Sequence, residues 1–460
     1  MGINEFRQRE INFVLGMIVI LIGSCIFFNI SLLFGFVGSI LLTSAILMRK
    51  GRQLRQVTNM IYQGILECRM LYLLILLIGA TVSVWLSSGV VPTMIYYGLQ
   101  YMGGMNFLLA AFLITSIMAV FMGTAVGTVS TIGLALLGIG KGFGIPTHIL
   151  LGAIISGAFI ADKISPISGL LNLTLTATKT KYKETLKSMM VTFVPVYVIT
   201  LASYYYIGSG YGVSTNLGSL IAYQSAILEG FYISPWLLLL PLGILFSSIM
   251  GIRTISTISM GLMAGVLVSV FLQNMSSSSV FHAIIWGYKS NTASGQLNNI
   301  LISGGIASMV EVVSIVACAV SLSSVLERSG LIRPMINKMI STIESEKQLI
   351  VKTGITSSIL TVVTCDQTVG IVLPGRLFAE KYKELGVSNS VLARTISDTG
   401  TVIAPLMPWN VNALIIGLIS GIPAMAYAPY AVFCYVCPII SMMAGLRLKS
   451  KKYPKAKALG

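Results

Sequence analysis

The sequence has very little charge. Of its 460 residues, 10% are Asp, Glu, Lys or Arg and 55% are hydrophobic, whereas a soluble domain carries about 25% charged residues. The mean hydropathy is +0.89, which excludes a typical soluble domain. Because many apolar runs approach the ~20 residues that a helix needs to cross a bilayer, the sequence predicts an all-α polytopic membrane protein with about 10–12 transmembrane segments.

Clusters of metal-binding or catalytic residues are also missing. The two histidines, His148 and His282, are isolated, and the six cysteines are scattered. Cys434 and Cys437 form a C-x-x-C pair inside the last apolar run. No second ligand pair accompanies them, so we interpret them as small packing residues. No pairing of a nucleophile with a base is recognisable either. The sequence therefore predicts neither an enzyme nor a resident metal or cofactor.

The charge that is present is mostly positive and lies between the apolar runs. The formal net charge is +16, and basic loops occupy residues 49–55 and 179–187. Short loops rich in Lys and Arg are typical of the cytoplasmic side of a membrane protein, which predicts a cytoplasmic N-terminus. The sequence has no basic stripe interleaved with aromatic residues, so a nucleic-acid partner is not expected. The expected partner is the lipid bilayer.

Aspartate is rare and its positions are informative. The chain has three aspartates, Asp162, Asp366 and Asp398, among its 14 acidic residues, and all three fall in apolar stretches. Ionisable residues at membrane depth are costly and generally functional. The alternative is that each caps a helix or forms a buried pair, such as Asp162 with Lys163 or Asp398 with Arg394.

One of these stretches, residues 152–172, combines an apolar run with charge and helix-breaking residues. It reads GAIISGAFIADKISPISGLLN. Pro166 removes a backbone donor and Gly169 loosens the turn, so we expect the helix to break between them. A broken helix at membrane depth is tolerated only where it is buried in protein or lines a cavity. The stretch therefore predicts an ion or substrate site in a transporter.

A second stretch repeats this pattern about 240 residues later. Residues 393–412 read ARTISDTGTVIAPLMPWNVN; Ser165-Pro166 is matched with Ala404-Pro405, and Asn172 with Asn412. Such similarity between two halves is typical of transporters built from repeats, with the site at the repeat interface. We predict an N-terminal helical hairpin and basic loop (1–57), a first transporter repeat (58–207), a connecting segment with transmembrane helices (208–299), a second transporter repeat (300–447) and a basic C-terminal tail (448–460).

Residues 123–144 are dense in glycine and hydroxyl residues and include Thr124 and Thr128. Two interpretations stay open for this stretch. Small residues allow close helix packing, whereas a discontinuous helix would free backbone groups and hydroxyls to coordinate a cation.

The two regions resemble a known family. GTAVGTVSTIGLALLGIGKGFGIP and GAIISGAFIADKISPISGLLNL are similar to the first motif region of the NhaC family of sodium/proton antiporters, within the ion transporter superfamily. DQTVGIVLPGRLF and ARTISDTGTVIAPLMPWN resemble its second motif region. The resemblance implies two inverted repeats with re-entrant hairpins and broken helices. It also implies secondary active transport, sodium coupling and a prokaryotic cell membrane.

The resemblance also implies which residues line the site. Carried over by position, these are Asp162, Ser165, Ser168 and Asn172 in the first half, and Asp366, Gln367, Asp398, Thr399, Thr401, Trp409 and Asn410 in the second. Sodium is expected at the helix breaks, held by carbonyls, hydroxyls and aspartates, with protons competing for the same carboxylates.

The sequence departs from the family pattern at two acidic positions. Family members usually continue the Ser-Pro with Ser-Asp-Thr-Thr-Asn, where this chain has Gly169 after Ser168, and they usually carry Glu where Ser397 stands. The main interpretation is a sodium/proton antiporter. The alternative is a sodium-coupled symporter or exchanger of a small organic acid or amino acid, in which Lys163 and Arg376 could pair with a substrate carboxylate. A homodimer is compatible with both of these interpretations.

Overall fold

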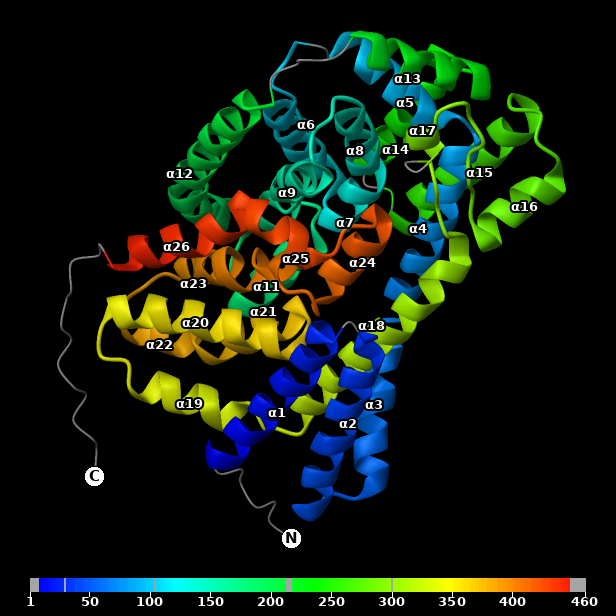
Figure 1. Cartoon of the computed structure of the whole chain (residues 1–460). Helices are drawn as coiled ribbons and strands as arrows, with labels where there is room; N and C mark the ends of the chain where they lie inside the picture. The colour runs from blue at the N-terminus through cyan, green and yellow to red at the C-terminus, as the bar shows by residue number, and fades with distance from the viewer. Residues whose placement is uncertain are drawn as a thin grey trace, which may run out of the picture.

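The computed structural model describes residues 8–446, except 29, 103, 212–216, 251, 253 and 299–300. Within these ranges every element is a helix, and the one strand-like pairing is a single bridge between Lys289 and Ile302 (Figure 1). Among the described residues, seven helices are long and apolar enough to cross a membrane, or up to ten if each of three bent pairs is one span. The predicted all-α polytopic membrane fold is confirmed. The predicted tail at 448–460 lies outside the described residues.

One group of helices forms what we call the scaffold unit. Its centre is α18, which packs against α2, α3 and α4, while α15 and α16 pack on α4 (Figure 1). Small residues allow the closest approach, since a Cβ added at Gly64 would lie 2.7 Å from the Cβ of Ser324. Its helices are α1 (Gln8–Phe27), α2 (Leu32–Arg49), α3 (Leu54–Glu67), α4 (Arg69–Ser87), α14 (Leu239–Ile249), α15 (Thr254–Phe271), α16 (Ser277–Trp286), α17 (Gly295–Asn298) and α18 (Gly305–Arg328).

The first repeat consists of a helical hairpin, a broken helix and a long helix. The hairpin packs against the broken helix through α6 and α9, and α12 covers α6. Its elements are α6 (Phe107–Met122), α7 (Ala125–Thr128), the π-helical turn η1 (Val129–Gly133), α8 (Leu134–Gly142), α9 (Thr147–Ala158), α10 (Ile160–Ile164), α11 (Gly169–Thr178) and α12 (Tyr182–Ser209).

The second repeat has the same order of parts. Here α20 packs against α21, α23 and η3, and α26 covers α20. Its elements are α20 (Glu346–Thr364), α21 (Gln367–Leu377), α22 (Ala379–Glu384), α23 (Asn389–Ile396), the π-helical turn η3 (Ser397–Thr401), the 3₁₀ turn η4 (Ala404–Leu406), α24 (Val411–Ser420), α25 (Ala424–Tyr427), the 3₁₀ turn η5 (Ala428–Tyr430) and α26 (Val432–Leu446). The connecting elements are α5 (Val90–Tyr101), α13 (Leu217–Gly230), η2 (Pro235–Leu238) and α19 (Arg333–Ser341).

The two broken helices run in opposite directions. The side chain of Asn389, at the start of α23, donates a hydrogen bond of 3.1 Å to the carbonyl of Thr178, at the end of α11. The second broken helix therefore starts where the first one ends, which is the arrangement of inverted repeats. The residue boundaries predicted for the repeats, 58–207 and 300–447, stay predictions.

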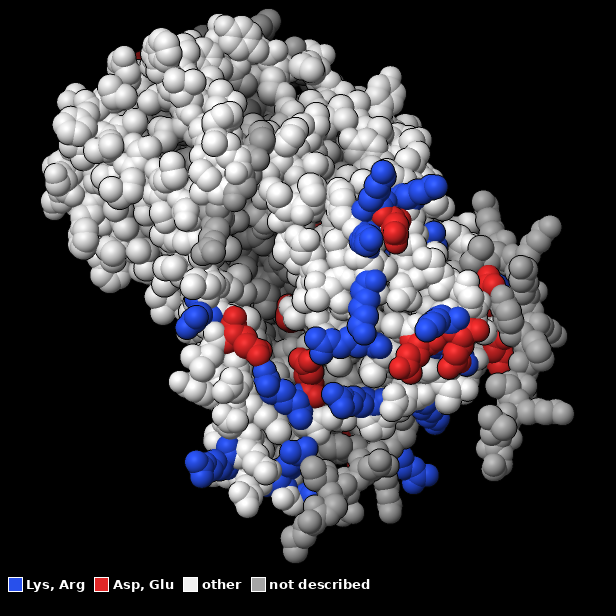
Figure 2. Space-filling model, turned by 180° about the vertical axis from the view of Figure 1, so that it is seen from behind, with Lys and Arg blue, Asp and Glu red and all other residues white. Residues whose placement is uncertain are grey.

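Charged side chains have an uneven distribution on the surface. On the face shown in Figure 2, Lys, Arg, Asp and Glu gather over the lower half, and the upper part is almost free of them. The ion pairs of Arg328 with Glu67 and of Lys50 with Glu10 belong to the charged loops and helix ends of the scaffold unit. This concentration at one end fits the pattern expected of a membrane protein with basic cytoplasmic loops.

Tyr204 on α12 ties the two repeats together. Its side chain is fully buried, and its hydroxyl lies 2.6 Å from Oγ of Ser156 and 2.7 Å from the carbonyl of Tyr430. The backbone N–H of Val432 donates to the same oxygen at 3.2 Å. One hydroxyl thus satisfies polar groups at the break before α26.

We expect Tyr204→Phe to destabilise the protein by about 1–3 kcal/mol, because buried polar groups would lose their partner. Tyr205→Phe is the matched control, since this neighbouring tyrosine is 64% exposed. Thermal unfolding of both variants in the same detergent measures the difference. Equal midpoints for the two variants would contradict the role of Tyr204.

Candidate functional site

Both hairpins turn through the same two-residue backbone conformation. α6 ends at Gly123 (φ 68°, ψ 12°), and Thr124 (φ −148°, ψ 129°) is the N-cap of α7. α20 ends at Cys365 (φ 61°, ψ 6°), and Asp366 (φ −137°, ψ 141°) is the N-cap of α21. A left-handed residue followed by an extended one reverses the chain without a longer loop. The predicted site residues Asp366 and Gln367 therefore lie at a hairpin tip.

The two broken helices also share their backbone conformation. Ser165 ends α10 in an extended conformation and Ser168 caps α11; Met407 ends η4 in the same way and Asn410 caps α24. The equivalent breaks are thus residues 165–168 and 407–410. The sequence match of Ser165-Pro166 with Ala404-Pro405 is wrong, because Pro405 lies inside a 3₁₀ turn and does not break the chain.

The broken helix of each repeat packs against the hairpin of the other repeat. α11, after the first break, packs against α21 of the second hairpin, and α24, after the second break, packs against α7 and α8 of the first hairpin. α10 contacts η3 directly. Residues of both repeats therefore meet at the centre of the fold.

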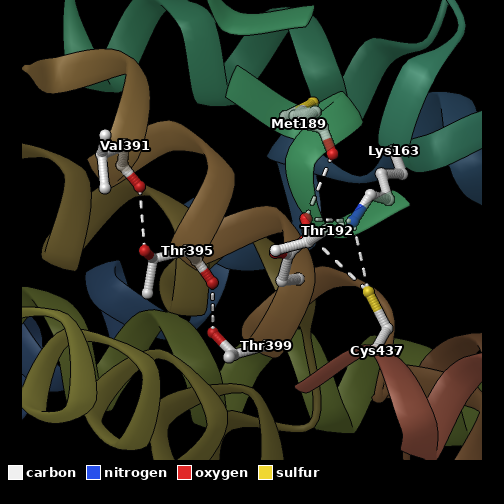
Figure 3. A network of polar contacts seen from close by, with 8 residues as sticks. Lys163, Met189, Thr192, Val391, Thr395, Thr399 and Cys437 are labelled. Carbon is white, nitrogen blue, oxygen red and sulfur yellow. Dashed lines mark hydrogen bonds and ion pairs between the residues drawn. The ribbon is translucent and has the colours of Figure 1, made fainter. Parts of the chain in front are cut away.

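A buried ion pair lies at this meeting point. Nζ of Lys163 on α10 donates to Oδ1 of Asp398 on η3, and neither side chain has any exposed surface. The ammonium also donates to Oγ1 of Thr192 at 3.4 Å and to Sγ of Cys437 at 3.2 Å (Figure 3). The alternative pairs considered from sequence, Asp162 with Lys163 and Asp398 with Arg394, are not the ones formed.

Two partners of this pair were not predicted from the sequence. Thr192 lies in the middle of α12, and Cys437 lies on α26 with its sulfur 3.6 Å from Oδ1 of Asp398. Neither residue stands in the two motif regions, and the C-x-x-C pair that contains Cys437 was interpreted as packing. Cys437 is thus more than the packing residue that the sequence predicted, since its thiol contacts both charges.

Asp162, on α10 of the first broken helix, contacts the first hairpin and not the ion pair. Its carboxylate accepts a hydrogen bond of 3.3 Å from Oγ of Ser168 and another from the backbone N–H of Ala125, at the start of α7. The side chain is 5% exposed. A carboxylate at this position interacts favourably with the positive end of the continuous helical segment at 125–142. Ser165 fixes the same junction by donating to the carbonyl of Val120 at 2.6 Å.

Unpaired polar atoms occur on the π-helical turn that carries Asp398 and at the break that follows it. The second carboxylate oxygen of Asp398, the hydroxyls of Ser397 and Thr401, and Nδ2 of Asn410 are all buried and have no hydrogen-bond partner within the described part of the chain. Buried polar groups are almost always paired, so a cluster of unpaired ones needs an explanation. Three of these four atoms are oxygens, the donor type that holds hard cations.

A hydrogen-bonded network closes the other side of this cluster. Gln367, at the start of α21, donates to the carbonyl of Thr401 and accepts from Nδ2 of Asn412 at 2.8 Å. Asn412 also contacts Asn410 at 3.2 Å. Trp409 donates to the carbonyl of Val362 at 2.7 Å. The second hairpin is thus bound to the second break.

The other predicted site residues lie outside this cluster. Asn172 is exposed and bonds to its own break at Ser168, while Thr124 and Thr128 bond within the first hairpin. Asp366 is the N-cap residue of α21 and is half-buried, and Thr399 donates to the carbonyl of Thr395. Arg376 is exposed in the last turn of α21, so it is not brought to the ion pair. That the predicted residues bind ions stays a prediction.

Crossed repeats, paired helix breaks and a buried charged centre define the class of this protein. They are the architecture of a secondary transporter in a multi-pass membrane protein. The sequence model described as "Na+/H+ antiporter family" matches residues 170–446. The chain belongs to this family.

Relatives with curated names agree with this assignment. The Na+/H+ antiporter NhaC of Alkalihalophilus pseudofirmus is 31% identical over 370 residues, 80% of each chain. NhaC of Bacillus subtilis is 29% identical over 88% of this chain and 90% of its own. A malate-2H+/Na+-lactate antiporter of B. subtilis is 28% identical over 97% of this chain and 96% of its own. All three are named as antiporters.

We expect Lys163→Met and Asp398→Asn each to lower the free energy of unfolding by about 3–5 kcal/mol, because each leaves one buried charge unpaired. Combining Lys163→Met with Asp398→Asn should cost less than the sum of the two, since no buried charge is then left without its partner. Chemical unfolding in detergent measures these differences.

The surface pair of Lys381 and Glu384 supplies the control for this series. Lys381→Met should cost no more than about 1 kcal/mol. Strict additivity of the two central substitutions would contradict a coupled pair.

Proposed function

We propose that this protein is a secondary active antiporter that exchanges sodium ions for protons across the cell membrane. Family membership supports the class of transport. The observation that carries the assignment to this site is the fully buried pair of Lys163 and Asp398, beside buried oxygens that have no partner among the described residues. Charges at such depth are typical of ion pathways.

The sodium ion would bind on the side of Asp398 that Lys163 does not occupy. The free carboxylate oxygen, with the hydroxyls of Ser397 and Thr401, supplies oxygen ligands around the π-helical turn. Unwound helix segments add backbone carbonyls, which coordinate sodium in other transporters. Binding would satisfy groups that are otherwise buried without partners.

The proton would come from Lys163. A sodium ion on Asp398 places two cations against one carboxylate, which disfavours the charged form of the lysine. Lys163 would then release its proton as sodium binds, so one proton leaves for each sodium ion that enters and the net charge of the centre stays the same. Asp162, a second buried carboxylate, offers a further place for a proton or a cation.

Alternating access would follow from movement of the repeats against the scaffold unit. Lys163 and Asp398 come from different repeats, so exchanging a sodium ion for the ammonium changes a contact that holds the repeats together. Inverted-repeat transporters open to the two sides of the membrane by such relative motions.

A second function is sodium-coupled transport or exchange of a small organic acid or amino acid. Two observations support this alternative function. The chain lacks two acidic positions that its family pattern carries, at Gly169 and Ser397. A relative named as a malate-2H+/Na+-lactate antiporter aligns with 97% of this chain.

We expect Asp162→Asn and Asp398→Asn each to abolish sodium-driven proton movement, because both remove a buried carboxylate from the proposed pathway. The measurement uses purified protein in liposomes with a trapped pH dye and an imposed sodium gradient. Glu380→Gln, an exposed change on α22, is the control and should leave the exchange intact. Exchange at normal rates in both Asp variants, with equal protein incorporation, would overturn the assignment.

A matched pair of threonines tests the sodium ligands more finely. Thr401 has an unpaired buried hydroxyl, whereas the hydroxyl of Thr399 donates to the carbonyl of Thr395 at 2.6 Å. Thr401→Val should raise the sodium concentration needed for half-maximal exchange by about tenfold, the effect of losing about 1.4 kcal/mol of binding. Thr399→Val should change it little. The reverse order would place the sodium ion elsewhere.

A further inference from the structure

A cavity of about 510 Å³ lies between the scaffold unit and the repeats. Its walls come from α4 and the N-terminus of α18 on one side, and from α8 and the end of α24 on the other. It is distinct from the ion pair, since α24 separates the two: Asn410 caps one end of α24, and Ser420, at the other end, lines the cavity. Ten helical residues correspond to about 15 Å.

The cavity wall is mainly aliphatic and holds one charged group. Aliphatic side chains from four helices cover most of it, among them Leu86, Leu137 and Leu418. Lys141, in the last turn of α8, is the charged side chain among the lining residues; it is exposed at the rim of the cavity, and it makes no ion pair within the described ranges. Thr147 adds a hydroxyl to this rim.

The start of α18 adds a second source of positive potential. Gly304 lines the cavity and is the N-cap of this 24-residue helix, with no side-chain hydrogen bond to cap it. The free N–H groups and the helix dipole at such an end favour anions. Lys141 and the α18 terminus line the same cavity from different units.

A second cavity adjoins this one. A neighbouring cavity of about 710 Å³ shares Ile302 and Ser303 with it and is lined by His282 and Lys289. No acidic residue lines either cavity. The basic cluster of Arg328 lies at the other end of α18, about 36 Å away along the helix. The two lysines thus mark a separate anion-attracting region, remote from the charged loops.

We propose that this cavity binds a small organic carboxylate with an apolar carbon body, as a second solute of the exchange. The carboxylate lies between Lys141 and the N-terminus of α18, and the carbon body packs on the aliphatic wall. Ligand pockets of this size usually combine apolar walls with a few polar groups that orient the ligand. The inference rests on the proposed exchange, because a solute bound between scaffold and repeats affects transport only if these parts move.

The experiment measures binding and exchange separately on the full-length protein. Calorimetric titration in detergent uses butyrate and lactate as probes, with chloride as the inorganic comparison. Wild type should bind the carboxylates saturably and chloride much more weakly. Lys141→Gln should weaken carboxylate binding at least about tenfold, the effect of losing one charge-assisted hydrogen bond. Lys141→Arg should stay within about threefold of wild type.

Two further variants separate charge from shape and from general effects. Ile422→Trp narrows the cavity without changing charge and should also weaken carboxylate binding. Lys383→Gln removes an exposed lysine on α22 and should change nothing. Sodium/proton exchange in liposomes without carboxylate should persist in all of these variants, because none of them belongs to the ion site.

The outcomes distinguish the two proposals. Sodium/proton exchange without saturable carboxylate binding would overturn the carboxylate site and leave the antiporter assignment standing. Carboxylate binding that is insensitive to Lys141→Gln would overturn the location. Carboxylate binding that depends on Lys141, in a protein that shows no sodium/proton exchange, would support the site while overturning the proposed exchange.

Discussion

The structure depends on one ion pair that joins its two halves. Lys163 and Asp398 are both fully buried, and removing such charges from water costs several kcal/mol for each ion unless partners compensate. The compensation comes from Thr192 and Cys437, on the helices that cover each repeat. The breaks in α10–α11 and η4–α24 supply further polar groups at the same depth. The hydrophobic helices thus surround a charged centre, and the burial of its two charges is tolerated because Lys163 and Asp398 are paired.

This arrangement links occupancy of the site to contact between the repeats. One carboxylate oxygen of Asp398 accepts a hydrogen bond from Lys163, and the other is buried without a partner among the described residues. A cation that binds the free side competes electrostatically with the ammonium on the other. Because that ammonium belongs to the opposite repeat, this competition would weaken the electrostatic attraction between the two repeats. In the proposed mechanism, ion exchange and conformational change therefore share one charged group.

The sequence predicted the class of protein and the buried aspartates better than it predicted which residues contact Asp398. Hydropathy predicted a polytopic helical protein, and the scarcity of aspartate singled out Asp398, since charge in apolar runs is conspicuous. The partnership with Lys163 was missed because it crosses 235 residues and depends on how the repeats pack. Cys437 carried no signal, since a thiol in an apolar helix resembles a packing residue. The repeat register was placed at Pro405 because an Ala-Pro within a 3₁₀ turn reads like a helix break.

The two π-helical turns occupy different parts of the two repeats. η1 lies in the first repeat's hairpin segment, whereas η3 lies in the second repeat's broken helix. The two repeats therefore differ in local backbone conformation, and the unpaired oxygens around η3 have no counterpart in the first broken helix among the described residues. If the repeats exchange conformations, the protein that faces the opposite side of the membrane is not related to this one by an exact two-fold rotation. An ion arriving from each side would then meet a different set of ligands, which makes the transporter intrinsically directional in its affinities.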